Sequence, residues 1–164
     1  MQYIDRGGII VTILIGLNIL GFTIMIWKLI VLSIVRFQKE NMVENTLDFI
    51  KKNNQNFDKK SLQNALDIQI QELELGLSTV NNIASIAPLP GLLGTVVGVL
   101  TAFDAIATQG LGDPSIFSGG ISIALITTVA GLIVAIPHYI GYNYFIGLLD
   151  RIELTLGKDV LERL

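Results

Sequence analysis

ASIAPLPGLLGTVVGVLTAFDAIA, residues 84–107, is the stretch that decides the fold of this chain. It carries one charge, Asp104, near its end, and it exceeds the about 20 apolar residues that a transmembrane helix needs. Small residues recur along it at steps of three and four, which places them in one stripe on a helix. The stripe comprises Ala84, Pro88, Gly91, Thr95, Gly98, Ala102 and Ala105, and Gly94 adds a second small pair with Gly98. The stretch therefore predicts a membrane span with close helix packing or a narrow lumen along that side.

Residues 119–143 repeat this design and predict another span. They contain no Asp, Glu, Lys or Arg, and their small stripe comprises Gly120, Ala124, Thr128, Gly131 and Ala135. Thr127 is expected to point away from this stripe. Pro137 lacks an amide hydrogen, so we expect the helix to bend near Ile133. Because both spans carry small stripes, we expect these stripes to hold copies of the chain together in a homo-oligomer.

A further span is predicted for residues 9–35. Its first part is uncharged, and Trp27 and Lys28 follow where interfacial aromatic residues and snorkelling lysines are usual. With 51% hydrophobic and 15% charged residues in 164, the chain is typical of an integral membrane protein. We read the first apolar run as a retained span, because no small-residue cleavage site follows it.

Two amphipathic segments flank the later spans. Residues 36–82 are polar with a helical period, which is interrupted by the asparagine-rich stretch KKNNQNFD at 51–58. From residue 61 a leucine stripe runs on toward the second span, so we expect one long helix that leaves the membrane as a stalk. Residues 144–164 are amphipathic as well. The predicted fold is an all-α membrane protein with three transmembrane helices, long cytoplasmic helical extensions and an oligomeric ring around a pore.

The distribution of basic residues predicts the topology. Six lie in residues 36–82 and three in residues 144–164, whereas residues 1–8 contain one and the loop at 108–118 contains none. We therefore expect residues 36–82 and 144–164 to be cytoplasmic, and residues 1–8 and 108–118 to be periplasmic. The second span is assigned to residues 83–107 and the third to residues 119–143.

Composition excludes several classes of function. The chain has no cysteine, which excludes thiol catalysis and disulfides, and its net charge of −3 gives no indication of nucleic-acid binding. The single histidine, His138, has no carboxylate or second histidine at metal-ligand spacing. We interpret it as a packing residue, with a proton exit as the secondary hypothesis. No paired catalytic groups occur in the spans, so no enzyme activity, metal or cofactor is predicted.

Two threonines are the main candidates for a functional site. Thr95 and Thr128 lie on the two small stripes and fall near mid-membrane when the spans run in opposite directions. Each could simply bond to its own helix, but their pairing favours a polar lining of a shared interface. Asp104 lies near the end of its span, so the sequence has no carboxylate at mid-membrane, where proton carriers usually lie. If the chain conducts protons, another subunit must supply the carboxylate.

The second and third spans also carry motifs of a known family. The residues are Ala87-Pro88-Leu89-Pro90-Gly91-Leu92-Leu93-Gly94-Thr95-Val96 with Gly98 and Phe103, then Gly120-Ile121, Ala124-Leu125, Thr128, Gly131-Leu132, Ala135-Ile136-Pro137 and Tyr142-Asn143. They resemble the proton-channel family that includes ExbB, TolQ and, more remotely, MotA. ExbB is favoured over TolQ, and the four-span MotA branch fits less well.

The resemblance implies a homo-oligomeric ring, a pentamer in this family, around the single-span helices of an ExbD- or TolR-like partner. That partner carries the proton-binding Asp, and proton flow drives a TonB- or TolA-like protein. Thr95 and Thr128 match threonines that the family places against the pore. One departure is clear, since Ile123 stands where ExbB and TolQ usually carry a Glu. Proton or sodium specificity, the cargo and the ring stoichiometry stay open.

These observations predict an ExbB/TolQ-like channel subunit in the bacterial inner membrane, with its N-terminus periplasmic and its C-terminus cytoplasmic. Two alternatives remain. One is a TolQ-like subunit of a Tol-Pal system, and the other is a non-conducting scaffold that assembles a single-span partner in the bilayer.

Overall fold

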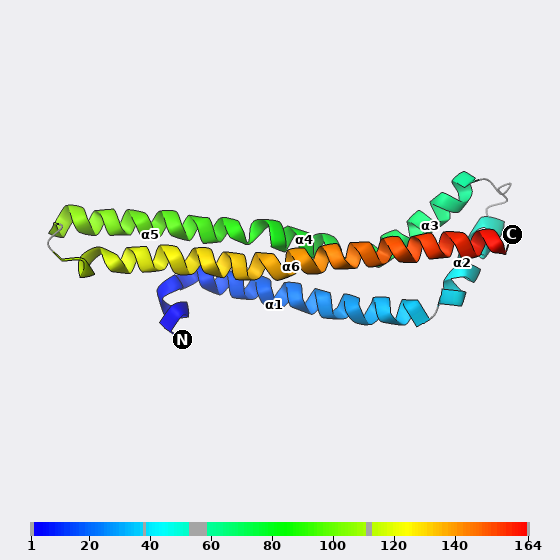
Figure 1. Ribbon diagram of the computed structural model, residues 1–164, viewed down its shortest axis with the longest axis horizontal. Helices are drawn as coiled ribbons and strands as arrows, with labels where there is room; N and C mark the ends of the chain where they lie inside the picture. The colour runs from blue at the N-terminus through cyan, green and yellow to red at the C-terminus, as the bar shows by residue number, and fades with distance from the viewer. Residues whose placement is uncertain (1, 38, 53–58, 111–112, 164) are drawn as a thin grey trace. The chain divides into compact units, whose positions relative to one another are not determined.

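The computed structural model describes residues 2–37, 39–52, 59–110 and 113–163, and its regular structure in these ranges is entirely helical (Figure 1). The helices are α1 (Gln2–Phe37), α2 (Lys39–Lys52), α3 (Lys59–Glu74), α4 (Leu77–Ile86), α5 (Pro88–Gln109) and α6 (Ser115–Glu162). The predicted all-α fold is confirmed. The part of the asparagine-rich stretch at 53–58 lies outside the described residues.

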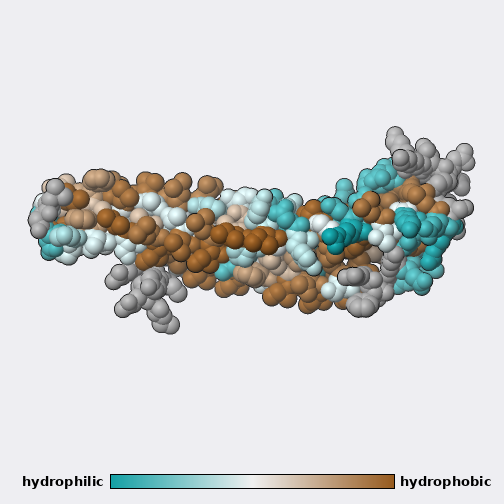
Figure 2. All heavy atoms as spheres, viewed as in Figure 1, coloured by the Kyte–Doolittle hydropathy of each residue, from teal (hydrophilic) through white to brown (hydrophobic). Residues whose placement is uncertain are grey.

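Three helical segments are long and apolar enough to cross a membrane: Gly7–Val35, Leu77–Gln109 and Ser115–Glu162. They contain the stretches predicted as spans. Figure 2 shows hydrophobic side chains gathered over α5 and hydrophilic ones over α3. Most large side chains of α5 are exposed, as lipid-facing or partner-facing residues are.

The chain forms two compact units, and the first comprises residues 1–23 and 79–140. Its core joins three helices: Leu14 of α1, Ile83 of α4, and Val134 with Ala135 of α6 pack together around Ala87. Ala87 itself has helical dihedral angles and its amide donates to the Ile83 carbonyl, so α4 passes into α5 with its hydrogen bonding maintained. Pro88 follows at the first position of α5, where a missing amide hydrogen costs least.

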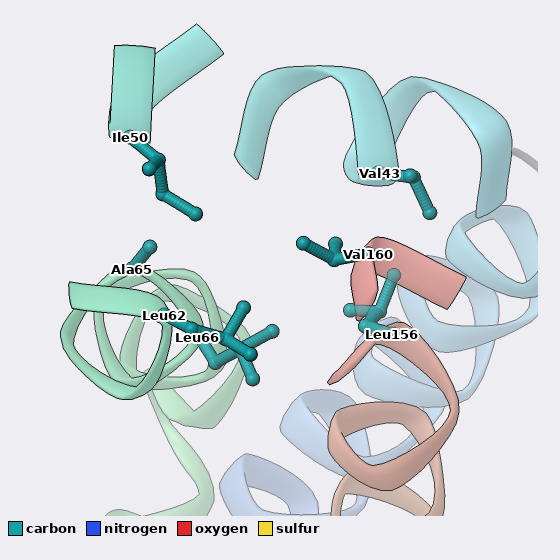
Figure 3. Packing of buried hydrophobic residues seen from close by; sticks show 7 residues of the cluster. All are labelled: Val43, Ile50, Leu62, Ala65, Leu66, Leu156 and Val160. Atoms are coloured by element: carbon teal, nitrogen blue, oxygen red, sulfur yellow. The ribbon is translucent and has the colours of Figure 1, made fainter. Parts of the chain in front are cut away.

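The second unit comprises residues 24–78 and 141–164. Leu32 and Leu77 pack against Phe145 and Leu149 of α6 in one cluster. A second cluster joins α2, α3 and the end of α6, as Figure 3 shows. Its buried members are Val43, Ile50, Leu62, Ala65, Leu66, Leu156 and Val160. The amphipathic stripes of the polar segments thus bury their apolar sides against each other.

The expectation of one long helix from the polar segment into the second span is wrong. The helix stops at Glu74 and restarts at Leu77, and between them Gly76 has a φ of 88°, a left-handed conformation that favours glycine. The leucine stripe continues on both sides of this break, which is why helical periodicity alone did not reveal it.

Helix α6, in contrast, is one continuous helix that includes Pro137 and the predicted amphipathic tail. At its beginning the Ser115 amide donates to Asp113 Oδ1 at 2.9 Å. This hydrogen bond lowers the pKa of the exposed Asp113 carboxyl below its usual range, because it favours the ionised form.

Candidate functional site: a threonine pair between two glycine-lined helices

Helices α5 and α6 approach each other backbone to backbone. A Cβ on Gly98 would lie 2.5 Å from the Gly120 carbonyl oxygen and 2.7 Å from the Ala124 amide nitrogen. A Cβ on Gly120 would meet the backbone around Gly98 and Ala102 in the same way. Nearer the beginning of α5, Gly91 lies against Gly131 of α6. A Cβ on either glycine would lie 3.3 Å from the Cα of the other.

These contacts are made within one chain. The stripes that we expected to hold copies together instead pair α5 with α6 of the same chain, so the expectation of an intermolecular contact through Gly91, Gly98 and Gly131 is corrected. Small residues were needed on both helices because the backbones meet closely, leaving no space for larger side chains. Ala135 lies elsewhere, in the core shared with Leu14 of α1.

Thr127 faces α5, contrary to the expectation that it points away. Its side chain is fully buried and fills the place that a side chain on Gly94 would occupy. Its hydroxyl donates back to the carbonyls of its own helix, at 2.9 Å to Ile123 and 3.1 Å to Ala124. The line of closest contact therefore runs through Gly94 and Thr127, one residue before each predicted site threonine.

Thr95 and Thr128 lie at the edge of this contact line and are half-buried. Their hydroxyl oxygens are within hydrogen-bond distance of each other. The Thr95 hydroxyl also lies 3.1 Å from the Ala124 carbonyl oxygen and 3.3 Å from that of Gly91, and the Thr128 hydroxyl lies 3.5 Å from the Gly91 oxygen. Each hydroxyl has one hydrogen and two lone pairs, so the pair can donate and accept across the two helices.

The remaining predicted residues are spread over the chain. Asp104 is exposed near the end of α5, away from the threonine pair in sequence. Ile123 is half-buried on α6, and Pro137 lies inside the same helix. His138 is fully buried, with Nδ1 at 2.7 Å from the Val134 carbonyl oxygen, and its ring lies against Gly21 and Phe22 of α1.

Lys28, in the second unit, has a structural role that the sequence did not predict. It does not extend away as a snorkelling lysine, since its side chain is 1% exposed and Nζ donates to the Leu73 carbonyl at 2.8 Å. Nζ also lies 4.9 Å from the centre of the Trp27 ring. Leu73 belongs to the last turn of α3, whose carbonyls lack helical partners. Lys28 therefore satisfies a carbonyl that the break at Gly76 leaves free.

Among the residues that the structure describes, no group of three or more His, Cys, Asp or Glu side chains could hold a metal ion. The site that these residues build is a pair of hydroxyl groups inside an apolar helical hairpin. Such a pair can position a proton or a water, but it contains no nucleophile with an adjacent base.

Residues 33–157 match the family model of the MotA/TolQ/ExbB proton channel family. The match covers all of α5, α6 as far as residue 157, and the threonine pair. The chain belongs to this family, a family of proton-channel membrane proteins rather than enzymes.

Relatives with the ExbB and the TolQ name both match the chain. A protein of Methanothermobacter thermautotrophicus named as a putative biopolymer transport protein ExbB homolog is 36% identical over 98 residues, covering 57% of this chain and 34% of its own. The biopolymer transport protein ExbB of Aquifex aeolicus is 42% identical over 76 residues, or 46% and 51% of the two chains. The Tol-Pal system protein TolQ of Pseudomonas aeruginosa is 33% identical over 99 residues, or 60% and 42%.

The chain thus spans about a third to a half of the length of these curated relatives. The predicted family is confirmed. Together with three apolar helices, the relatives indicate a multi-pass inner-membrane protein.

Proposed function

We propose that this chain is the proton-channel subunit of an inner-membrane motor of the ExbB–ExbD–TonB kind, which couples the proton gradient to energy-dependent transport across the outer membrane. Family membership supports the channel class. The observation that carries the site assignment is the hydroxyl pair of Thr95 and Thr128, half-buried at the edge of the α5–α6 contact. At that edge the two hydroxyls are available to a neighbouring helix as well as to each other.

The proton itself needs a carboxylate from elsewhere. Among the described residues of α5, and of α6 as far as Tyr142, Asp104 is the one carboxylate, and it is exposed near the end of α5. A partner with a single span and an Asp, of the ExbD or TolR kind, would bring that group to the threonine pair. The hydroxyls would stabilise the carboxyl and relay its proton directly or through water, because an unpaired polar group in hydrocarbon is costly.

Several copies would surround the partner in a ring, a pentamer in our proposal. The close glycine contact between α5 and α6, here called the glycine seam, is made by Gly91, Gly94 and Gly98 with Gly120 and Gly131. This seam is already filled within each chain, so copies would meet through the other faces of the spans. These faces present large apolar side chains, including Leu93, Val97 and Leu100, which are 57%, 47% and 60% exposed. A TonB- or TolA-like protein would then transmit the movement, with the N-terminus of this chain periplasmic and its C-terminus cytoplasmic.

Replacement of both threonines by valine tests this site. Valine keeps the shape of threonine and deletes the hydroxyl, so assembly should survive while proton flux falls at least about tenfold, the loss that 1.4 kcal/mol of barrier produces. The measurement is proton flux in vesicles that contain this chain and an Asp-bearing single-span partner expressed from a neighbouring reading frame. Native mass spectrometry of the same preparations checks that the complex forms.

Thr101→Val and Thr155→Val are matched controls. Both threonines are exposed, and their hydroxyls donate to their own helices, at 2.9 Å to Val97 and 2.7 Å to Arg151. Flux should be unchanged in these variants. A Thr95→Val/Thr128→Val complex that conducts at the unmodified rate would show that the pair only packs α5 against α6.

The relatives also support a second function, a TolQ-like subunit of a Tol-Pal envelope system. The partner that co-purifies distinguishes the two, since a TonB-like or a TolA-like protein would be recovered. A non-conducting scaffold is the third alternative, and an assembled complex without any proton flux would support it.

A further inference from the structure

The second unit contains a cavity between helices α1, α2 and α6. Its volume is about 420 Å³, which lies within the range of about 300–1,000 Å³ that is usual for small-molecule sites. Val35 of α1, Met42 of α2, and Leu148, Arg151 and Ile152 of α6 contribute to its lining. The cavity therefore combines an apolar wall with a side chain that is always positively charged, and the proposed proton path does not use it.

The cavity lies where two apolar stretches of the chain end. Val35 is the last residue of the first helical segment that is apolar enough to cross a membrane. In α6 the apolar run FIGLL at 145–149 is followed directly by Asp150 and Arg151. Because Val35 and Arg151 line the same cavity, the two stretches end at the same level. Basic residues are typical of this boundary of a membrane helix, so the cavity lies beside the lipid headgroups.

Arg151 is exposed and has no counter-ion among the residues that the structure describes. The other two basic residues of the tail are paired, Lys158 with Glu162 and Arg163 with Glu40, each at 3.7 Å. Glu40 and Glu162 line a different cavity, together with Arg163. The cavity at Arg151 thus presents a positive charge that an anionic ligand can neutralise.

We propose that this cavity binds one anionic phospholipid per chain. The lipid phosphate accepts hydrogen bonds from the Arg151 guanidinium, whose planar fork fits two phosphate oxygens. The first part of an acyl chain covers the apolar wall formed by Met42, Leu148 and Ile152, and continues into the hydrocarbon core. A free phosphate would leave this wall uncovered, and a zwitterionic headgroup would bring a second cation toward Arg151. The site therefore prefers phosphatidylglycerol to phosphatidylcholine.

Native mass spectrometry of the full chain tests the proposal and needs no protein partner. The chain is freed of lipid in detergent and titrated with phosphatidylglycerol or phosphatidylcholine that carry the same acyl chains. Phosphatidylglycerol should bind once per chain, and half-saturation should need about ten times less of it than of phosphatidylcholine, the effect of one charge-assisted contact. Glycerol 3-phosphate at equal concentration should not displace it. Equal binding of the two lipids, or displacement by glycerol 3-phosphate, would overturn the proposal, and equal binding would favour a protein segment as the occupant.

Two pairs of variants separate the charge from the cavity. Arg151→Gln should raise the half-saturating concentration of phosphatidylglycerol about tenfold. Lys158→Gln makes the same change in net charge on the same helix and should leave binding unchanged, because Lys158 is already paired. Val35→Phe fills part of the cavity without a change in charge and should weaken binding. Ile34→Phe is its control, since Ile34 is 50% exposed and does not line the cavity.

Circular dichroism checks that each variant keeps its helices. Normal binding of phosphatidylglycerol by Arg151→Gln or by Val35→Phe would overturn the proposal. Losses of the same size in Lys158→Gln or Ile34→Phe would overturn it as well, because they would show binding by general charge or general lipid contact.

Discussion

Gly98 faces the backbone of α6 rather than a side chain that could move aside. Its nearest potential contacts are the Gly120 oxygen and the Ala124 nitrogen. We expect Gly98→Ala to lower the free energy of unfolding by about 1–3 kcal/mol, because the two helices must separate to admit the methyl group. Unfolding of the purified chain by increasing SDS in mild detergent, followed by circular dichroism, measures the change.

Gly119→Ala is the matched control for this substitution. Gly119 is next to Gly120 on α6, yet a Cβ there would have no heavy atom within 4 Å. The variant should be neutral or up to about 1 kcal/mol more stable, since alanine favours a helix more than glycine does. Equal losses in both variants would mean that the cost arises from a general effect of the added methyl group, such as its contact with lipid, and not from the close contact between α5 and α6.

At this scale the sequence identified the close-packing faces of α5 and α6 but assigned them to contacts between copies of the chain. The spacing of Gly91, Gly98 and Gly131 identified the close faces. It could not decide between Thr127 and Thr128, because each fits a step of three or four between Ala124 and Gly131. Only the rotation of the two helices about their axes places Thr127 at the centre and Thr128 at the edge. That rotation depends on packing that no single helix encodes.

At the scale of elements, the end of α3 depends on a residue from α1. Lys28 donates a hydrogen bond to the Leu73 carbonyl at the C-terminal end of α3. This is the negative end of the helix dipole, where a lysine is favoured. Lys28→Met keeps much of the apolar stem and deletes the donor. We expect the free energy of unfolding to fall by about 1–3 kcal/mol, the usual cost of leaving a buried acceptor unpaired. Faster hydrogen exchange of amides near the break would accompany the loss.

Lys158→Met serves as the comparison for Lys28→Met. Lys158 is exposed and pairs with Glu162 at 3.7 Å on the helix surface, where such pairs contribute little. Its unfolding free energy should change by less than about 0.5 kcal/mol. If Lys28→Met is equally mild, the contact with Leu73 does not stabilise the end of α3.

The sequence offered one signal for this break, the glycine at position 76. An isolated glycine in a helical pattern often marks a helix end, but Leu73, Leu77 and Val80 keep the helical period across it. The hydrogen bond that compensates for the break comes from a lysine 45 residues earlier. A contact at that separation follows from tertiary packing, so periodicity could not predict it.

At the scale of the whole molecule, the orientation in the membrane is a prediction that labelling can check. The basic residues place Asp113 outside and Lys158 inside. The chain has no native cysteine, so Asp113→Cys should react with a membrane-impermeant maleimide added to intact spheroplasts. Lys158→Cys should react only after the membrane is permeabilised. The reverse pattern would invert the proposed topology.

The glycine seam also has a consequence for how the protein is made. Each chain buries the close backbone contacts of α5 and α6 against itself. Formation of this hairpin is therefore a unimolecular step that does not vary with the amount of protein in the membrane. Association of copies is a separate step that follows mass action. Newly synthesised chains at low abundance should already contain the paired threonines, before any second copy or partner arrives.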